Sequence, residues 1–199
     1  EFVITDHNKS FDLAVKHANS IGFMVIKGTE ITRKKPIGHL NALFIQDANK
    51  LDLPDPVDAI KAAVAQGAFI LWNHPGWPDD QTTMYDIHKE LINNKLIHGV
   101  ELTNGFNWYP RVMVWAKEYG LTIQANTDMH QTTATTYEKG KYRTMTLVFA
   151  KEKSEEAIKE ALFAGRTLAI FQGYIAGRED YLKSLIRASL DIRVINEKK

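Results

Sequence analysis

Residues 56–77 read Pro-Val-Asp-Ala-Ile-Lys-Ala-Ala-Val-Ala-Gln-Gly-Ala-Phe-Ile-Leu-Trp-Asn-His-Pro-Gly-Trp, and this stretch decides the fold class. The segment from Pro56 to Gln66 spaces its apolar residues about 3.6 apart, which predicts a helix. The run from Ala68 to Trp72 is short and apolar throughout, which predicts a buried strand. A helix that leads into a buried strand is the unit from which α/β folds are built.

The same alternation extends over most of the chain. Short apolar runs predict further strands at Phe2 to Ile4, Gly22 to Ile26, Ala42 to Ile45, Gly99 to Leu102, Leu121 to Ala125 and Thr144 to Ala150. Apolar spacing predicts helices at Lys9 to Ser20, Met84 to Asn94, Trp108 to Tyr119 and Ser154 to Ala164. Because parallel strands need a long crossover that a helix supplies, we expect parallel pairing in an incomplete barrel, with residues 1–199 as one domain.

Composition excludes several classes of site and partner. An apolar share of 44% and a charged share of 25% are ordinary for a globular protein, and a net charge of +1 creates no field for nucleic acid or membranes. No apolar run approaches the roughly 18 residues of a membrane helix. The chain has no cysteine, so any metal must be held by His, Asp and Glu. Compartment, cytoplasmic or exported, and oligomeric state stay undetermined.

Polar residues follow four of the predicted strands directly. His7, Glu30 and His74 each come just after an apolar run, and Asp128 with His130 follows another. The carboxyl ends of parallel strands converge on one face of an α/β fold, so we expect these side chains to meet there. Asp128 and His130 can face the same pocket because alternate residues of an extended segment point to the same side. Such a nitrogen and oxygen set suits zinc, manganese or iron better than calcium.

Other residues receive weaker assignments. Trp77, in Asn-His-Pro-Gly-Trp, could form an apolar wall over the site or simply cap a loop. Arg143 could bind an anionic oxygen, since its guanidinium fork matches phosphate. For His17, His88 and His98 we expect ordinary surface or packing roles, with His98 at the opposite end from the site.

Six short motifs occur in a familiar order: Ile-Thr-Asp-His-Asn, Gly-Thr-Glu, Gly-His-Leu, Asn-His-Pro, Gly-Val-Glu and Asp-Met-His. In this order they resemble the polymerase and histidinol phosphatase (PHP) family of metal-dependent phosphoesterases, most closely its Sb-PDE-like bacterial phosphodiesterase branch. The resemblance covers most of the chain. It implies a distorted seven-stranded barrel with two or three divalent metals, with Glu30 as a bridging ligand and His7, His39, His74, Asp128 and His130 as the other ligands.

The family's opening His-x-His strand, which an acidic ligand follows, is absent from this sequence. The chain begins with Glu1 rather than methionine and enters a predicted strand at once, so we expect the first strand of the barrel to lie upstream. Two interpretations of Thr5-Asp6-His7-Asn8 therefore stand. His7 is either the family's early ligand or part of a later, similar segment.

These observations predict a hydrolase of small phosphate esters, a phosphodiesterase more than a histidinol-phosphatase-like monoesterase. Asp128 and His130 are candidates to accept or relay a proton, and Arg143 to neutralise charge on phosphate oxygens. Trp77, Glu101 and Arg143 are candidate substrate-pocket residues. Two alternatives remain, a metal-dependent amidohydrolase-like enzyme and a non-catalytic, ligand-binding PHP-like protein.

Overall fold

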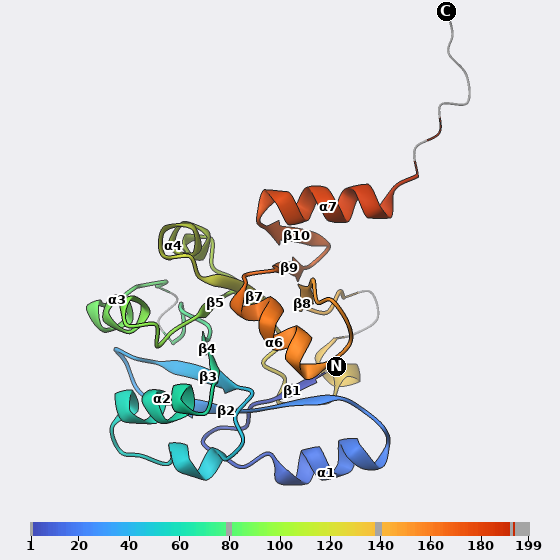
Figure 1. The fold of residues 1–199 in the computed structure, drawn as a ribbon. Helices are drawn as coiled ribbons and strands as arrows, with labels where there is room; N and C mark the ends of the chain where they lie inside the picture. The colour runs from blue at the N-terminus through green and yellow to red at the C-terminus, as the bar shows by residue number, and fades with distance from the viewer. Residues whose placement is uncertain (1, 79–80, 138–140, 192, 194–199) are drawn as a thin grey trace, which may run out of the picture.

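The computed structural model describes residues 2–78, 81–137, 141–191 and 193, and shows a mixed α/β fold with a curled, half-barrel sheet (Figure 1). Seven strands form this sheet in the order β1-β2-β3-β4-β5-β6, with β7 also paired to β5. Their bounds are β1 (Phe2–Ile4), β2 (Val25–Thr32), β3 (His39–Leu43), β4 (Phe69–Trp72), β5 (Gly99–Asn104), β6 (Asn107–Trp108) and β7 (Thr122–Asn126). A second sheet pairs β8 (Met145–Val148), β9 (Thr167–Phe171) and β10 (Tyr174–Gly177).

Most of the helices stand between strands, as the apolar spacing predicts. They are α1 (Asp12–Ser20), η1 (Ala48–Leu51), α2 (Pro56–Ala65), α3 (Asp86–Asn93), α4 (Arg111–Tyr119), α5 (Thr133–Thr136), α6 (Glu155–Phe163) and α7 (Glu179–Ser189). Local chemistry explains the start of α2, because the Asp55 carboxylate accepts hydrogen bonds from the backbone N–H groups of Val57 and Asp58. The sequence did not predict β9, β10 or α7.

The expectation of parallel pairing is only partly correct. Strand pairs β1–β2, β4–β5 and β5–β7 are parallel, whereas β2–β3, β3–β4 and the second sheet are antiparallel. Only residues 33–38 connect β2 to β3, which is too short for the crossover that a parallel pair requires. This turn becomes one wall of the site described below.

Strand β4 lies at the centre of the core, and both of its faces are covered. Ile70 and Trp72 pack in a cluster that includes residues of α2, whereas Phe69 and Leu71 pack with Ile158 of α6. All four residues of β4 are at most 3% exposed. A strand buried on both faces needs apolar residues at every position, which explains the uninterrupted run from residue 69 to 72.

Threonine hydroxyls join the second sheet to β7. The Thr146 hydroxyl accepts from the Ala125 N–H and donates to the Ala125 carbonyl, with both distances 2.9 Å. The Thr167 hydroxyl donates to the Ile123 carbonyl at 2.6 Å. These contacts hold β8 and β9 against β7, so the second sheet continues the curve of the first beyond β7 (Figure 1).

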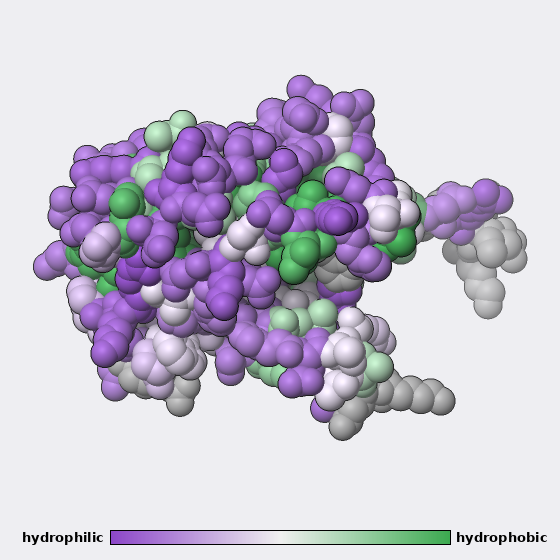
Figure 2. All heavy atoms as spheres, turned by 90° about the horizontal axis from the view of Figure 1, so that it is seen from below, coloured by the Kyte–Doolittle hydropathy of each residue, from purple (hydrophilic) through white to green (hydrophobic). Residues whose placement is uncertain are grey.

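The face of the molecule seen in Figure 2 carries mostly polar residues. Figure 2 shows one face that is largely hydrophilic, with hydrophobic residues in small, separate patches. Within the described ranges, no helix combines the length and the apolar character needed to cross a bilayer.

The half-buried histidine His98 predicts a loss of stability in acid. Burial, with a contribution from Lys95, lowers the pKa of His98 to about 4, and its Nδ1 accepts a hydrogen bond from the Ile70 N–H. The unfolded chain, with a histidine pKa of about 6.5, therefore binds the extra proton first, and this contribution to stability is lost as the pH falls from about 6.5 through about 4.

Chemical denaturation of the His98→Asn variant, which keeps an acceptor but cannot titrate, is expected to show a shallower fall in stability across that window. The exposed His17→Asn variant is the control and should follow the wild type. Parallel curves for wild type and His98→Asn would contradict the assignment.

Candidate metal centre

The Glu30 carboxylate lies at the centre of a cluster of polar side chains. Glu30 is 3% exposed, within β2, so the prediction that it follows its strand is wrong. Its Oε1 lies 2.9 Å from His7 Nδ1 and 2.8 Å from His39 Nδ1, and accepts from the Thr32 hydroxyl at 2.7 Å. Its Oε2 accepts from the Asn73 amide at 3.2 Å. Segments far apart in sequence thus converge on one carboxylate.

This environment keeps Glu30 ionised. Burial acts to raise its pKa, but contacts with His39 and Thr32 and the charges of His39 and His7 outweigh burial and lower the pKa to about 2. A charged carboxylate with two imidazole nitrogens beside one oxygen is a suitable bridging ligand for cations.

The remaining predicted ligands continue from this carboxylate. His7 Nε2 faces His130 Nε2 at 3.3 Å, and Asp128 Oδ2 lies 4.0 Å from His74 Nε2. Neighbouring contacts close a ring of six side chains, in the order Glu30, His7, His130, Asp128, His74, His39 and back to Glu30. The sequence-based expectation that these residues meet in space is therefore met by the geometry.

Two features of the donor atoms fit a cation. His39 Nδ1 is buried and, although 2.8 Å from Glu30 Oε1, is not in hydrogen-bonding geometry with any protein atom. His130 Nδ1 lies 2.9 Å from the Asp128 carbonyl oxygen and must donate to it, which directs the Nε2 lone pair of a neutral ring towards His7. Ligand atoms of His7, Glu30 and His39 all lie within 4.8 Å of one another.

Two of the six residues have an unusual backbone. His74 has φ of 25° and Asp128 has φ of 48°, a region that side chains other than glycine rarely adopt and that costs about 1–3 kcal/mol. The turn at His74 also packs tightly, since a Cβ on Gly76 would come within 2.7 Å of the Tyr109 ring. Tight packing therefore helps to hold His74 in a strained position.

Glu101 supplies much of this support. It is 1% exposed and accepts hydrogen bonds from the His74 N–H at 2.6 Å and from the amides of Asn104 and Asn126 at 2.9 Å. Burial raises the pKa of Glu101 to about 7, although these three hydrogen bonds act to lower it. The prediction that Glu101 lines the substrate pocket is wrong in detail, because this carboxylate lies beneath the site and positions His74.

The other two predicted pocket residues, Trp77 and Arg143, lie in different parts of the structure. The Trp77 ring lies 4.9 Å from that of His39 and 5.4 Å from that of His74, and Trp77 is 56% exposed. It can therefore contact a ligand above the cluster. Arg143 is half-buried just before β8, and its contact with phosphate stays a prediction.

Among the histidines expected to be structural, His17 is exposed and His98 is packed beside Phe69, away from the cluster. His88, expected to be solvent-facing or partly buried, is instead 1% exposed and stacks on Trp72 at 3.9 Å. No sequence signal separated it from an ordinary helical histidine.

No protein-family model matches the chain, and neither does any curated protein. Solved structures, by contrast, do match the chain. A two-domain protein from Bacteroides vulgatus, described as containing a predicted PHP-like metal-dependent phosphoesterase, aligns with a TM-score of 0.93 and 39% identity, over 98% of this chain. The resemblance to PHP-like metal-dependent phosphoesterases is confirmed. The aligned region spans 63% of the length of the Bacteroides protein.

A second structure, a candidate metal-dependent phosphoesterase from Bifidobacterium adolescentis, aligns with a TM-score of 0.53 and 15% identity. The alignment covers 80% of this chain and 84% of that one, and at this identity it supports the fold alone. The finer assignment to the Sb-PDE-like branch stays a prediction.

Removing the Glu30 carboxylate should weaken metal binding. Glu30→Gln keeps the size of the side chain but removes the charge between His7 and His39, so we expect at least a tenfold loss of affinity for Mn²⁺ or Zn²⁺ in a calorimetric titration. Glu90→Gln, on the exposed face of α3, is the matched control. Unchanged affinity in Glu30→Gln would exclude this cluster as the metal site.

Proposed function

We propose that this chain is a metal-dependent hydrolase of phosphate esters, acting on diesters in preference to monoesters. The observation that carries the proposal is the closed ring of Glu30, Asp128 and four histidines, which five separate segments contribute. The similarity to PHP-like phosphoesterases favours phosphorus over a carbonyl carbon as the centre attacked, and so disfavours the amidohydrolase alternative.

Two or three divalent ions, zinc, manganese or iron, would be held by His7, Glu30, His39, His74, Asp128 and His130. When bound, such ions lower the pKa of water and withdraw charge from phosphate oxygens. The ionised Glu30 lies between two of the imidazoles, where it would balance the charge of more than one cation.

The remaining chemistry is assigned to two side chains of the ring and to three residues outside it. Asp128 and His130, both more exposed than Glu30, would accept or relay a proton. Trp77 would contact an ester substituent, and Arg143 would bind a phosphate oxygen. Glu101 would act indirectly, by holding the His74 backbone in its strained conformation.

The test is turnover of bis(p-nitrophenyl) phosphate and of p-nitrophenyl phosphate by metal-loaded protein. We expect the diester to be hydrolysed with the higher kcat/KM, and chelation or Asp128→Ala to reduce kcat by at least a hundredfold. Asp58→Ala, on the exposed surface of α2, should keep wild-type turnover. Wild-type rates in Asp128→Ala would refute the catalytic site, and a preference for the monoester would assign a phosphomonoesterase.

A further inference from the structure

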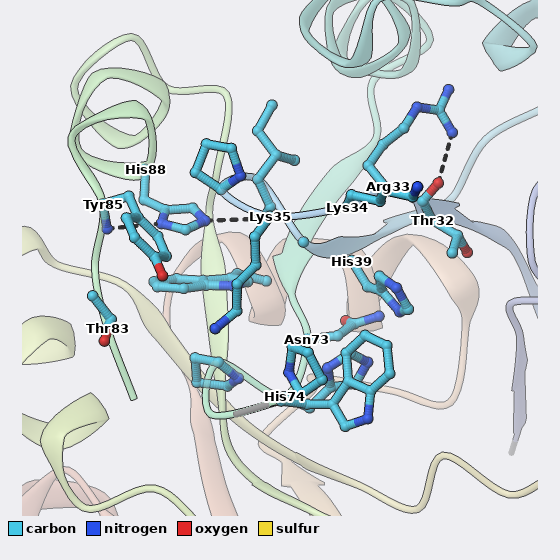
Figure 3. Close-up of a pocket in the computed structure, with 17 residues that line it drawn as sticks. Thr32, Arg33, Lys34, Lys35, His39, Asn73, His74, Thr83, Tyr85 and His88 are labelled. Atoms are coloured by element: carbon cyan, nitrogen blue, oxygen red, sulfur yellow. Dashed lines mark hydrogen bonds between the residues drawn. The ribbon is translucent and has the colours of Figure 1, made fainter. Parts of the chain in front are cut away.

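A cavity of about 520 Å³ opens beside the candidate metal centre, within the usual size range of small-molecule sites. The turn between β2 and β3 and the segment before α3 form its walls. Figure 3 shows His39 and His74 at one side, Tyr85 and His88 at the other, and the Lys35 side chain extending between them. His39 and His74 therefore belong to both the cluster and the cavity.

Buried contacts fix the shape of this cavity. The Trp72 indole stacks with the His88 ring at 3.9 Å and with the Trp115 ring at 5.4 Å, with interplanar angles of 20° and 6°. His88 Nδ1 accepts from the Tyr85 N–H at 3.1 Å, so its Nε2 carries the proton and donates to the Ile37 carbonyl at 2.9 Å. His88 thus connects the β2–β3 turn to the start of α3 and holds these two walls of the cavity together.

The lining indicates which chemical group the cavity accepts. Its aromatic side chains are Trp72, Trp77 and Tyr85, with prolines beside them. An aromatic lining suits either a planar ring or an ammonium group. The lining residues that the structure describes include Lys34 and Lys35 but no Asp or Glu, so the charge disfavours an ammonium group and favours a ring.

We propose that this cavity binds an aromatic substituent of the phosphate ester, while the phosphate lies at the metal centre. The inference rests on the proposed function for the position of the phosphate. It adds the substrate class, which is aryl or arylalkyl esters, and it adds Tyr85 and the cavity behind it to the binding site.

Phosphonates that cannot be hydrolysed test the cavity without requiring turnover. The Zn²⁺-loaded protein is titrated with benzylphosphonate, methylphosphonate and 2-(trimethylammonio)ethylphosphonate, and dissociation constants are measured by ligand-observed NMR. Because only the benzyl ring can bury its apolar surface in the cavity, we expect benzylphosphonate to bind at least tenfold more tightly than methylphosphonate. The trimethylammonio compound should bind more weakly than benzylphosphonate.

Variants at Tyr85 separate cavity binding from general affinity for phosphonates. Tyr85→Ala should bring the ratio of the benzyl and methyl dissociation constants close to one, whereas Tyr85→Phe, which retains the ring, should preserve the ratio. Tyr174→Ala, at a 72% exposed position on β10, is the control and should also preserve it. Thermal melting of each variant confirms that it is folded.

Equal constants for the benzyl and methyl compounds in the wild type, or no binding of benzylphosphonate, would overturn the inference. Tighter binding of the trimethylammonio compound would overturn it too and assign the cavity to cationic esters. Hydrolysis of bis(p-nitrophenyl) phosphate by the same sample reports on the proposed function separately. If the sample hydrolyses the diester but binds benzylphosphonate no more tightly than methylphosphonate, only the assignment of the cavity is wrong. If it prefers benzylphosphonate but hydrolyses no diester, only the proposed hydrolase function is wrong.

Discussion

The burial of the Glu30 carboxylate is the constraint on which the site depends. A charged carboxylate at 3% exposure costs several kcal/mol unless partners replace water around it. Here those partners come from the segment after β1, from β3, and from the loop that follows β4. These three segments must therefore lie side by side for Glu30 to be buried. The contacts that satisfy its charge also bring nitrogen and oxygen atoms together at one point.

Glu101 forms a second layer beneath this point. Burial raises the pKa of Glu101 to about 7, because its three hydrogen bonds from uncharged N–H donors offset burial only in part. For Glu30, contacts with histidines outweigh burial and lower the pKa to about 2. Glu101 holds the His74 backbone, whose φ of 25° would otherwise relax. The two carboxyl groups thus have different roles. Glu30 faces the candidate metal centre, and Glu101 keeps the candidate ligand His74 in place.

The antiparallel pairing of β2 and β3 links the centre to the neighbouring cavity. The short turn it requires, residues 33–38, places Ile37 where His88 can bind its carbonyl. His39, which begins β3, then faces Glu30 on one side and Trp77 on the other. The cavity and the candidate metal centre therefore share this turn, and a change in the turn would affect both.

The sequence by itself determined the α/β class and the buried strand at β4, because apolar periodicity is a local signal. The positions of His7, Glu30, His74, Asp128 and His130 after apolar runs marked them as candidates, whereas His39 was added only through the resemblance to PHP-like proteins. Burial of Glu101, the roles of His88 and Tyr85, and the strand directions were decided only by the tertiary structure. In the sequence, nothing distinguishes Glu101 from other polar residues of strands, or His88 from other histidines of helices. Their roles depend on neighbours 27 and 51 positions away in the chain, and no local pattern specifies such long-range contacts.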